Sequence, residues 1–256
     1  MNKQKEIIVF RTIENLAEHL FEILLGKTLN IPEGKYVSLA LSGGSTPKRI
    51  FDYLSSHNAG SINWKKVKIF WCDERCVPPD DEESNYKMTR LSLLQNLNIP
   101  DENIFRIYGE NEPEKEAIRY SQILRTNLIS KNALPKFDIV LLGIGEDGHT
   151  ASIFPGNSSL FQSVRFCEAV IHPQSGQQRI SITGSVINNA DRVIFIVTGA
   201  SKAEMLYKLV NDSGGKLFPA SLVNPTTGNL LWMIDTEAAK LLNQKLFREY
   251  TIQFKV

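Results

Sequence analysis

The chain of 256 residues has few cysteines, almost no net charge and no long apolar run. Its three cysteines, Cys72, Cys76 and Cys167, include no Cys-x-x-Cys pair and have no pair of histidines nearby, so no metal site is expected and a reducing, cytoplasmic compartment is the simplest interpretation. Lys and Arg number 29 against 28 for Asp and Glu, and this formal net charge of +1 argues against nucleic acid or a membrane surface as a partner. No segment approaches the roughly 20 apolar residues of a membrane helix, and the apolar stretch at residues 7–10 is too short for the core of a signal peptide.

Short apolar runs alternate with helical patterns along the whole chain. The runs that predict strands lie at residues 6–10, 36–44, 66–74, 137–145, 179–183, 192–199 and 230–235. Between them, apolar residues recur with the spacing of one helix face, around residues 16–24, 88–97 and 117–124. This alternation predicts an α/β sandwich with a mostly parallel central sheet. No repeat, low-complexity tract or long linker interrupts it, so a single domain over residues 1–256 is expected.

A pair of glycines ends the second of these runs and forms the first candidate site. Gly43 and Gly44 are followed by Ser45, Thr46 and Pro47, which predicts a turn into a helix with Ser45 or Thr46 as the N-cap and Pro47 at the first helical position. Free backbone amides at such a turn favour phosphate. The Gly-x4-Gly-Lys-Ser/Thr spacing of a nucleotide-binding loop is absent, so no nucleotide is expected, and a plain strand-to-helix turn is the alternative.

Two basic residues are candidate anion ligands. Ser201 and Glu204 have the spacing of a capping box, which predicts Lys202 in the first turn of a helix. A cation there opposes the helix dipole, and its presence suggests a nearby anion. Arg179 opens the predicted strand 179–183. The alternative for each is an ordinary solvated surface charge.

The stretch 71–86 places charged residues directly after an apolar strand. Asp73, Glu74 and Arg75 end the run together, a Pro-Pro turn follows, and Ser84 and Asn85 can then cap the next helix. A carboxylate beside a guanidinium at this position indicates either a structural ion pair or a site that orients a polar substrate.

The stretch 143–156 combines four glycines, two carboxylates and His149, one of only four histidines in the chain. It follows a predicted buried strand, and ligands of open parallel sheets bind beyond the carboxyl ends of the strands. His149 is therefore predicted at the edge of a site. The alternative is a glycine-rich turn with a solvated histidine.

Taken together, these stretches resemble the 6-phosphogluconolactonases of the pentose phosphate pathway. The matching blocks occur in the family's order and cover nearly the whole chain, at residues 41–47, 73–78 with 84–85, 137–156, 179–183, 198–206 and 230–235. Ile144 and Ile153 stand where the family often has Met and Leu, and both are apolar exchanges of similar volume. The resemblance implies the Rossmann-like fold of glucosamine-6-phosphate deaminases and ribose-5-phosphate isomerases. It also implies hydrolysis of 6-phospho-D-glucono-1,5-lactone to 6-phospho-D-gluconate, linked in function to glucose-6-phosphate dehydrogenase, with neither cofactor nor metal.

The resemblance and the chemistry of lactone hydrolysis assign roles around the carbonyl. His149 is the expected general base, because an imidazole changes its charge near neutral pH and can take the proton of an attacking water. Either Asp147 or Glu146 orients its ring. Asp73 and Arg75 are expected to face the sugar hydroxyls or the carbonyl, with Arg75 stabilising the developing charge.

The expected phosphate ligands are those of the turn and the two cations: Gly43, Gly44, Ser45, Thr46, Arg179 and Lys202. Gly143, Gly145 and Gly148 are expected to let the backbone approach the sugar and to offer amides to the oxyanion. Ser152 is a further expected substrate contact and an alternative nucleophile. No Gly-x-Ser-x-Gly elbow surrounds it, so water remains the expected nucleophile.

Two other functions stay open at this point. A glucosamine-6-phosphate deaminase or isomerase also carries a glycine turn and a histidine loop, and there Asp73 would move a proton at C2. This chain has "DER" and "TASIFPG" where the deaminases have "DEY" and "IAFNEPG". A non-catalytic sugar-phosphate sensor would need no base, and only one strand and one helix are predicted before residue 36.

Overall fold

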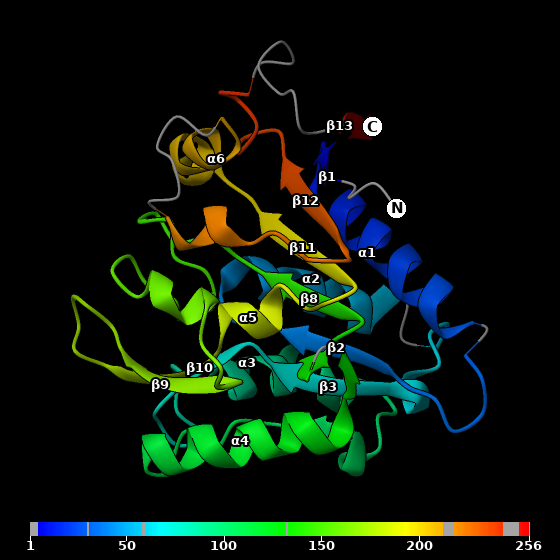
Figure 1. The fold of residues 1–256 in the computed structure, drawn as a ribbon. Helices are drawn as coiled ribbons and strands as arrows, with labels where there is room; N and C mark the ends of the chain where they lie inside the picture. Colours follow the sequence, from blue (N-terminus) through cyan, green and yellow to red (C-terminus); the bar gives the residue numbers. More distant parts are fainter. Residues whose placement is uncertain are drawn as a thin grey trace.

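Eight parallel strands form the central sheet of the protein, which runs from β13 and β1 at the top of Figure 1 to β3 near the bottom. The computed structural model describes residues 5–29, 31–57, 60–131, 133–211, 218–242 and 251–255. Across the sheet the strand order is β13-β1-β12-β11-β8-β2-β3-β5. In chain order these strands are β1 Lys5–Phe10, β2 Val37–Leu41, β3 Val67–Trp71, β5 Ile104–Phe105, β8 Ile139–Leu142, β11 Arg192–Val197, β12 Asn229–Asp235 and β13 Thr251–Lys255.

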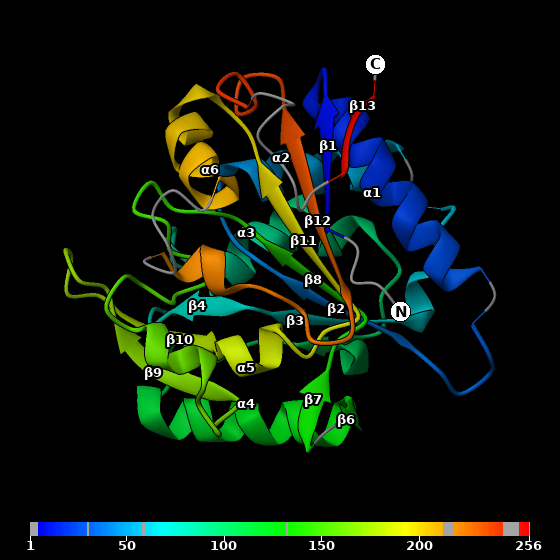
Figure 2. The same ribbon diagram turned by 45° about the horizontal axis from the view of Figure 1, so that its top comes forward.

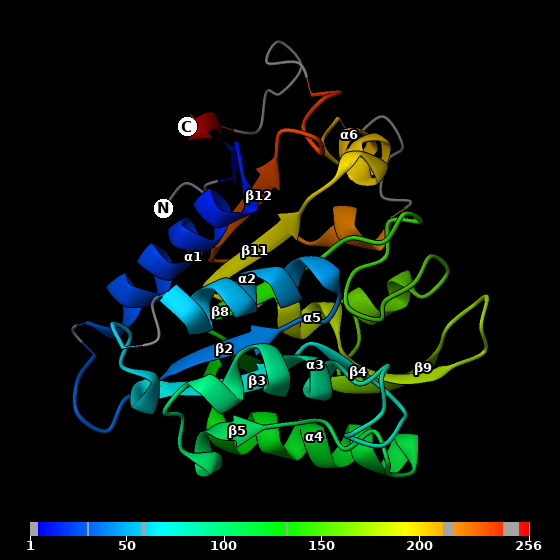
Figure 3. The same cartoon turned by 180° about the vertical axis from the view of Figure 1, so that it is seen from behind.

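Helices cover both faces of this sheet, and for that reason its central strands are apolar throughout. Every residue of β2 and of β8 is buried. The α-helices are α1 Ile13–Thr28, α2 Ser45–His57, α3 Asn85–Ser92, α4 Pro113–Asn127, α5 Gly184–Ile187 and α6 Ala203–Val210. Helices α1, α2 and α3 lie on the face shown in Figure 3, and α5 lies on the opposite face (Figure 1). The predicted α/β sandwich around a mostly parallel sheet is confirmed.

A small antiparallel sheet lies beside the main one, between it and α4 (Figure 2). Its strand order is β4-β10-β9, with β4 Asp73–Arg75, β9 Cys167–Ile171 and β10 Gln178–Ile182. Strands β6 Ile129–Lys131 and β7 Leu134–Lys136 form a separate pair. Short 3-10 helices complete the described structure: η1 Trp64–Lys66, η2 Leu94–Asn96, η3 Asp101–Asn103, η4 Ser158–Phe161, η5 Ala200–Lys202 and η7 Pro219–Leu222.

The order of the strands places a crevice at one point of the sheet. From β2 the chain continues outward through β3 to β5, whereas from β8 it continues in the other direction through β11 to β12. Because β2 and β8 are neighbours, the loops that leave their carboxyl ends diverge to opposite sides. Such a switch point is where open α/β sheets bind ligands.

Several predicted element boundaries are wrong. The run 66–74 is two strands in different sheets, since β3 ends at Trp71 and β4 begins at Asp73. Helix α2 begins at Ser45, so neither Ser45 nor Thr46 is its N-cap and Pro47 is its third residue. The reason is Gly44, whose φ of 109° turns the chain one step earlier than an ordinary cap would.

The expected capping box at Ser201 is also wrong. Residues 200–202 form the 3-10 helix η5, and α6 begins only at Ala203, with Lys202 as its N-cap and no side-chain cap. Gly199 causes this turn, because its φ is 92° and its amide donates to the carboxylate of Asp235. Ser84, by contrast, caps α3 as predicted, with its hydroxyl accepting from the Lys87 amide at 3.1 Å.

No helix in the described parts of the chain is both long enough and apolar enough to cross a membrane.

Candidate active site

A cavity of about 220 Å³ opens at the carboxyl ends of β2, β3 and β8. It brings together most of the predicted site residues: Gly43, Gly44, Asp73, Arg75, Gly145, His149, Arg179 and Lys202. A second cavity of about 160 Å³ adjoins it and is lined by Ser45 and Thr46 together with the shared Gly43, Gly44 and Lys202. Asp147 and Ser152 do not line either cavity.

Another cavity, of about 280 Å³, lies at the opposite end of the sheet, beside Lys68, Lys136, Asp138 and Asp191. Its charged groups already have partners, because Lys136 pairs with Asp191 and the Asp138 carboxylate accepts two hydrogen bonds from Ser38. The crevice at β2 and β8 is therefore the better candidate for an anionic ligand.

The glycine turn after β2 is tied to its neighbours on both sides. The Ser42 hydroxyl donates to the Leu141 carbonyl oxygen at 2.8 Å, and the hydroxyls of Thr46 and Thr198 lie 2.7 Å apart. Gly43 packs so closely on Asn85 that a Cβ at this position would lie 1.8 Å from the Asn85 Oδ1. The first amides of α2 have no acceptor in their own helix, and Ser45 and Thr46 line the second cavity, which suits an anion there.

His149 is oriented by Asp147. The Nδ1 atom of its ring lies 2.6 Å from the Asp147 Oδ1, which also accepts the His149 backbone amide at 3.1 Å. Because a carboxylate only accepts, Nδ1 carries the proton and Nε2 is left with a free lone pair. The side chain of His149 is 28% exposed, so this lone pair is accessible to water.

The two acidic residues of the histidine loop have different partners. Partial burial raises the pKa of Asp147, but hydrogen bonds from His149 and the charge of His149 together outweigh it, so the net effect is a lowered pKa. Glu146 lies 4.0 Å from the Lys202 Nζ instead. Of these two carboxylates, between which the sequence left the choice open, Asp147 is the one that contacts the ring.

Two of the three glycines expected to offer amides, Gly145 and Gly148, have backbone amides that are already hydrogen-bonded within the loop. The Gly145 amide donates to the His149 carbonyl oxygen at 2.9 Å, and the Gly148 amide donates to the Gly145 carbonyl oxygen at 3.1 Å. Gly145 instead makes room for the ring, because a Cβ there would lie 2.1 Å from the His149 Nδ1. Its contribution is close packing rather than an oxyanion contact.

Arg75 and Arg179 lie directly opposite one another on β4 and β10, and both line the cavity. Like charges at such paired positions destabilise an antiparallel sheet. Burial, and then the charge of Arg75, lowers the pKa of Arg179. The Nε atom of Arg75 is buried with no hydrogen-bond partner among the described residues. Two facing guanidiniums of this kind are best stabilised by an anion between them.

Asp73 is held by residues that the sequence analysis assigned other roles. The Ser152 hydroxyl donates to the Asp73 Oδ2 at 2.6 Å, and Ser152 is 0% exposed. The buried Asn85 amide donates to the Asp73 carbonyl oxygen at 3.0 Å and itself lines the cavity. Ser152 is therefore placed to orient Asp73. Asn85 lines the cavity, which the sequence did not indicate because a residue at this position is expected to cap a helix.

Glu74 builds the frame of this side of the cavity. Its carboxylate is 2% exposed and accepts from the Ser84 hydroxyl and from the backbone amides of Arg75, Asn85 and Tyr86. Burial raises the pKa of Glu74. The interaction ties β4 to the start of α3 and so fixes Arg75 and Asn85 relative to each other.

In the parts of the chain that the structure describes, no three His, Cys, Asp or Glu side chains gather as a group that could hold a metal ion.

Known proteins resemble this chain over most of its length. The family model described as glucosamine-6-phosphate isomerases/6-phosphogluconolactonase matches residues 11–232. A 6-phosphogluconolactonase of Haemophilus influenzae is 40% identical over 238 residues, which are 92% of this chain and 99% of the relative.

Solved structures show the same similarity. The crystal structure of devB protein has a TM-score of 0.89 at 38% identity, and covers 94% of this chain and 100% of its own. The 6-phosphogluconolactonase of Trypanosoma brucei has a TM-score of 0.80 at 28% identity, with the same coverage of 94% and 100%. A monomeric glucosamine-6-phosphate deaminase, at 23% identity and a TM-score of 0.78 over 92% of this chain and 99% of its own, shares the fold. The chain belongs to the family of glucosamine-6-phosphate isomerases and 6-phosphogluconolactonases.

Proposed function

We propose that this protein hydrolyses 6-phospho-D-glucono-1,5-lactone to 6-phospho-D-gluconate in the pentose phosphate pathway. Its curated relatives are named 6-phosphogluconolactonases. The observation that carries the proposal is the pairing of His149 with Asp147 at the wall of a cavity that also holds three cations, Arg75, Arg179 and Lys202. A base and a cluster of cations in one crevice match a substrate with a carbonyl to attack and a phosphate to anchor.

The reaction begins at the free Nε2 atom of His149. It takes a proton from a water molecule as the water oxygen attacks the lactone carbonyl, and Asp147 stabilises the imidazolium that results. The tetrahedral intermediate carries negative charge on the former carbonyl oxygen. It collapses by breaking the bond between the carbonyl carbon and the ring oxygen, which takes up a proton from the imidazolium to become a hydroxyl.

The cations and the glycine turn divide the remaining work. The turn of Gly43, Gly44, Ser45 and Thr46 provides amides for the phosphate, and Arg179 and Lys202 neutralise its charge. Arg75 faces the carbonyl, where its guanidinium stabilises the oxyanion. Asp73, oriented by Ser152, accepts from sugar hydroxyls.

The chain forms a single domain over residues 1–256. This is supported by one continuous hydrophobic core across the described elements. We place it in the cytoplasm, in line with its three free cysteines, with glucose-6-phosphate dehydrogenase as the enzyme that supplies the lactone and with no nucleic-acid partner.

The test is a parallel assay of two substrates. Freshly generated 6-phosphoglucono-δ-lactone and glucosamine 6-phosphate are supplied separately, and acid release and ammonia release are followed with spontaneous lactone hydrolysis subtracted. We expect acid from the first and no ammonia from the second. Ammonia release would instead identify a deaminase, and binding of either compound without turnover would identify a sensor.

A further inference from the structure

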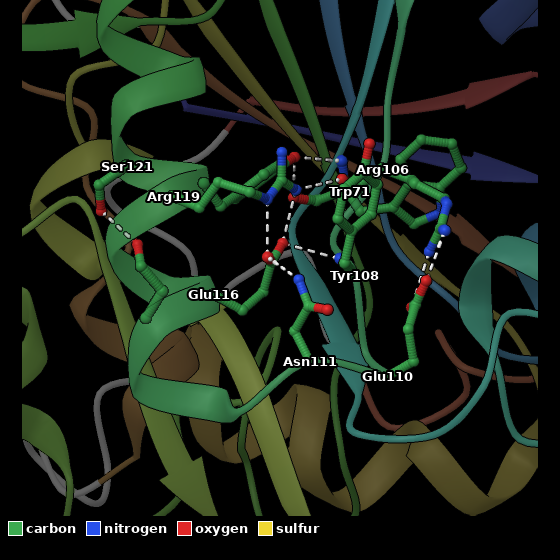
Figure 4. Close-up of polar contacts among 10 residues, drawn as sticks. Trp71, Arg106, Tyr108, Glu110, Asn111, Glu116, Arg119 and Ser121 are labelled. Atoms are coloured by element: carbon green, nitrogen blue, oxygen red, sulfur yellow. Dashed lines mark hydrogen bonds and ion pairs between the residues drawn. The ribbon is translucent and has the colours of Figure 1, made fainter.

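Two arginines outside the cavity, Arg106 and Arg119, have carboxylate partners, as Figure 4 shows for the loop before α4 and the helix itself. Both terminal nitrogens of Arg106 donate to the Glu110 carboxylate, at 2.9 and 2.6 Å. The Arg119 guanidinium donates to the fully buried Glu116 at 2.7 and 2.6 Å. In each pair the positive charge is neutralised by a fixed carboxylate, so neither arginine is free to bind an external anion.

The two cavity arginines differ from these in the chemistry of their partners. Arg75 donates to a backbone carbonyl oxygen, that of Glu83, at 2.6 Å. Arg179 donates through Nε to the side-chain oxygen of Gln177 at 3.1 Å. Among the described residues neither guanidinium forms an ion pair, and the terminal nitrogens of Arg179 have no hydrogen-bond partner. Both arginines are oriented by neutral acceptors and keep their full charge.

The amide of Gln177 can adopt only one orientation. Its Oε1 accepts from Arg179, and its Nε2 donates to the Glu83 Oε2 at 3.0 Å. A flipped amide would set Nε2 against the Arg179 donor and Oε1 against the Glu83 carboxylate, and both contacts would be repulsive. The pair also connects the turn between β9 and β10 with the loop that precedes α3, because Gln177 belongs to the first and Glu83 to the second.

We propose that Gln177 is a positioning residue for phosphate recognition: its neutral amide fixes Arg179 through Nε and leaves the two terminal nitrogens and the whole charge for the substrate. This inference rests on the proposed function, in which Arg179 binds the phosphate. A glutamate in place of Gln177 would lose the donor to Glu83, but it would keep an acceptor near Nε and turn Arg179 into a paired arginine like Arg119. Recognition of the phosphate then weakens although the guanidinium is still held.

The experiment compares Gln177→Glu and Gln177→Ala with matched changes at Gln178. Gln178 is the next residue, its side chain is exposed, and alternation along the strand directs it to the opposite face. Each variant is assayed with 6-phosphoglucono-δ-lactone and with unphosphorylated glucono-δ-lactone, and competitive inhibition by inorganic phosphate is measured. Thermal unfolding reports whether each variant is folded.

For Gln177→Glu we expect KM for the phosphorylated lactone and the inhibition constant of phosphate to rise about tenfold, with kcat and the unphosphorylated lactone changed less than about twofold. Gln177→Ala frees the guanidinium without neutralising it, so a rise of about threefold in the same two constants is expected. Gln178→Glu and Gln178→Ala remain near wild type.

The inference is overturned if Gln177→Glu leaves both constants unchanged, or if it slows the two lactones equally. It is also overturned if Gln178→Glu has the same effect, since a general change of charge would then explain the result. Should Gln177→Glu fail to fold, the phosphate inhibition constant of Gln177→Ala decides. Failure of the proposed function is a separate result, because wild type itself would then not hydrolyse the phosphorylated lactone above the spontaneous rate.

Discussion

Replacing Asp147 by Asn tests how His149 is held, and the structure predicts a smaller effect than a carboxylate-to-amide change has in a hydrolytic triad. In a triad the amide can present its NH2 group to the histidine and stabilise the wrong tautomer, at a cost of about 10⁴-fold in turnover. Here the Asp147 Oδ1 accepts both the ring Nδ1 at 2.6 Å and the His149 backbone amide at 3.1 Å. An asparagine must keep its oxygen at this position, because an NH2 group there would face a backbone N–H.

The magnitude follows from the loss of charge alone. The tautomer and orientation of the ring are retained, while a hydrogen bond to a charged acceptor, worth about 1.5 to 3 kcal/mol, becomes a neutral one worth about 0.5 to 1.5 kcal/mol. The difference of about 1 to 1.5 kcal/mol corresponds to a loss of about 5 to 15-fold in kcat. Asp147→Ala removes the acceptor altogether and frees the ring, so its loss should exceed about 100-fold.

The assay is steady-state hydrolysis of 6-phosphoglucono-δ-lactone at pH 7, corrected for spontaneous opening, with kcat and KM determined separately. Glu146→Gln is the matched control, because the same change is made one residue away on a carboxylate that does not contact the ring. We expect the control to stay within about twofold of wild type. A loss of about 10³-fold or more in a folded Asp147→Asn variant would refute the reasoning, since it would mean that the backbone amide does not fix the orientation of the side-chain amide.

Three further outcomes are expected. The pKa of Asp147 is lowered on folding, so its ionised form stabilises the native state. Wild type should therefore be more stable than Asp147→Asn by a constant free energy of unfolding above the unfolded pKa of about 3.9, and this difference should vanish as the pH falls through the lower folded pKa. Chemical denaturation across pH measures the difference. A difference that grows as the pH falls contradicts the assignment. Arg179→Ala should weaken binding of the phosphorylated lactone by about 1.5 to 3 kcal/mol and reduce the preference for it over glucono-δ-lactone. His149→Ala should instead slow hydrolysis of both lactones by about 10² to 10⁴-fold. If both variants affect the two lactones in the same way, the two residues do not have separate roles. Gly43→Ala should lower the free energy of unfolding by about 1 to 3 kcal/mol, because the new Cβ would lie 1.8 Å from the Oδ1 of the buried Asn85. Gly26→Ala is the control and should cost nothing, because the space around Gly26 is open. Calorimetry of the two variants distinguishes a steric clash at Gly43 from a general effect of replacing glycine.

The sequence predicted those parts of the fold that depend on local burial. The residues of β2 and β8 are apolar because both of their faces are covered, and a run of this kind is visible in the chain itself. The convergence of the site was predictable for a related reason, since loops at the carboxyl ends of neighbouring parallel strands must meet. His149 and Gly43 accordingly line the same cavity.

Contacts between distant segments could not be predicted in the same way. The pairing of Arg75 with Arg179 depends on an antiparallel register between β4 and β10, and nothing in either segment specifies the other. Ser152 lies close to His149 in sequence, yet the loop buries it completely against Asp73. These positions are set by tertiary packing, which overrides the local pattern.

Boundaries failed where glycine geometry decided them. Gly44 and Gly199 adopt φ values of 109° and 92°, and each starts a tighter turn than the neighbouring serines suggested. The short strand β5 and the edge strand β13 were missed because the first has two residues and the second is mostly exposed, so neither shows a clear apolar period.

The place of β1 in the sheet has a consequence for the biosynthesis of the protein. This strand lies between β12 and β13, so both of its partners are translated after every other described strand. From the completion of β1 at Phe10 to the start of β12 at Asn229, a ribosome working at about 5 to 20 residues per second needs roughly 10 to 45 s. Throughout that interval a strand whose last four residues are apolar and buried has neither of its hydrogen-bonded neighbours. Helix α1 follows β1 directly and packs on it, so it can cover this strand before β12 is made.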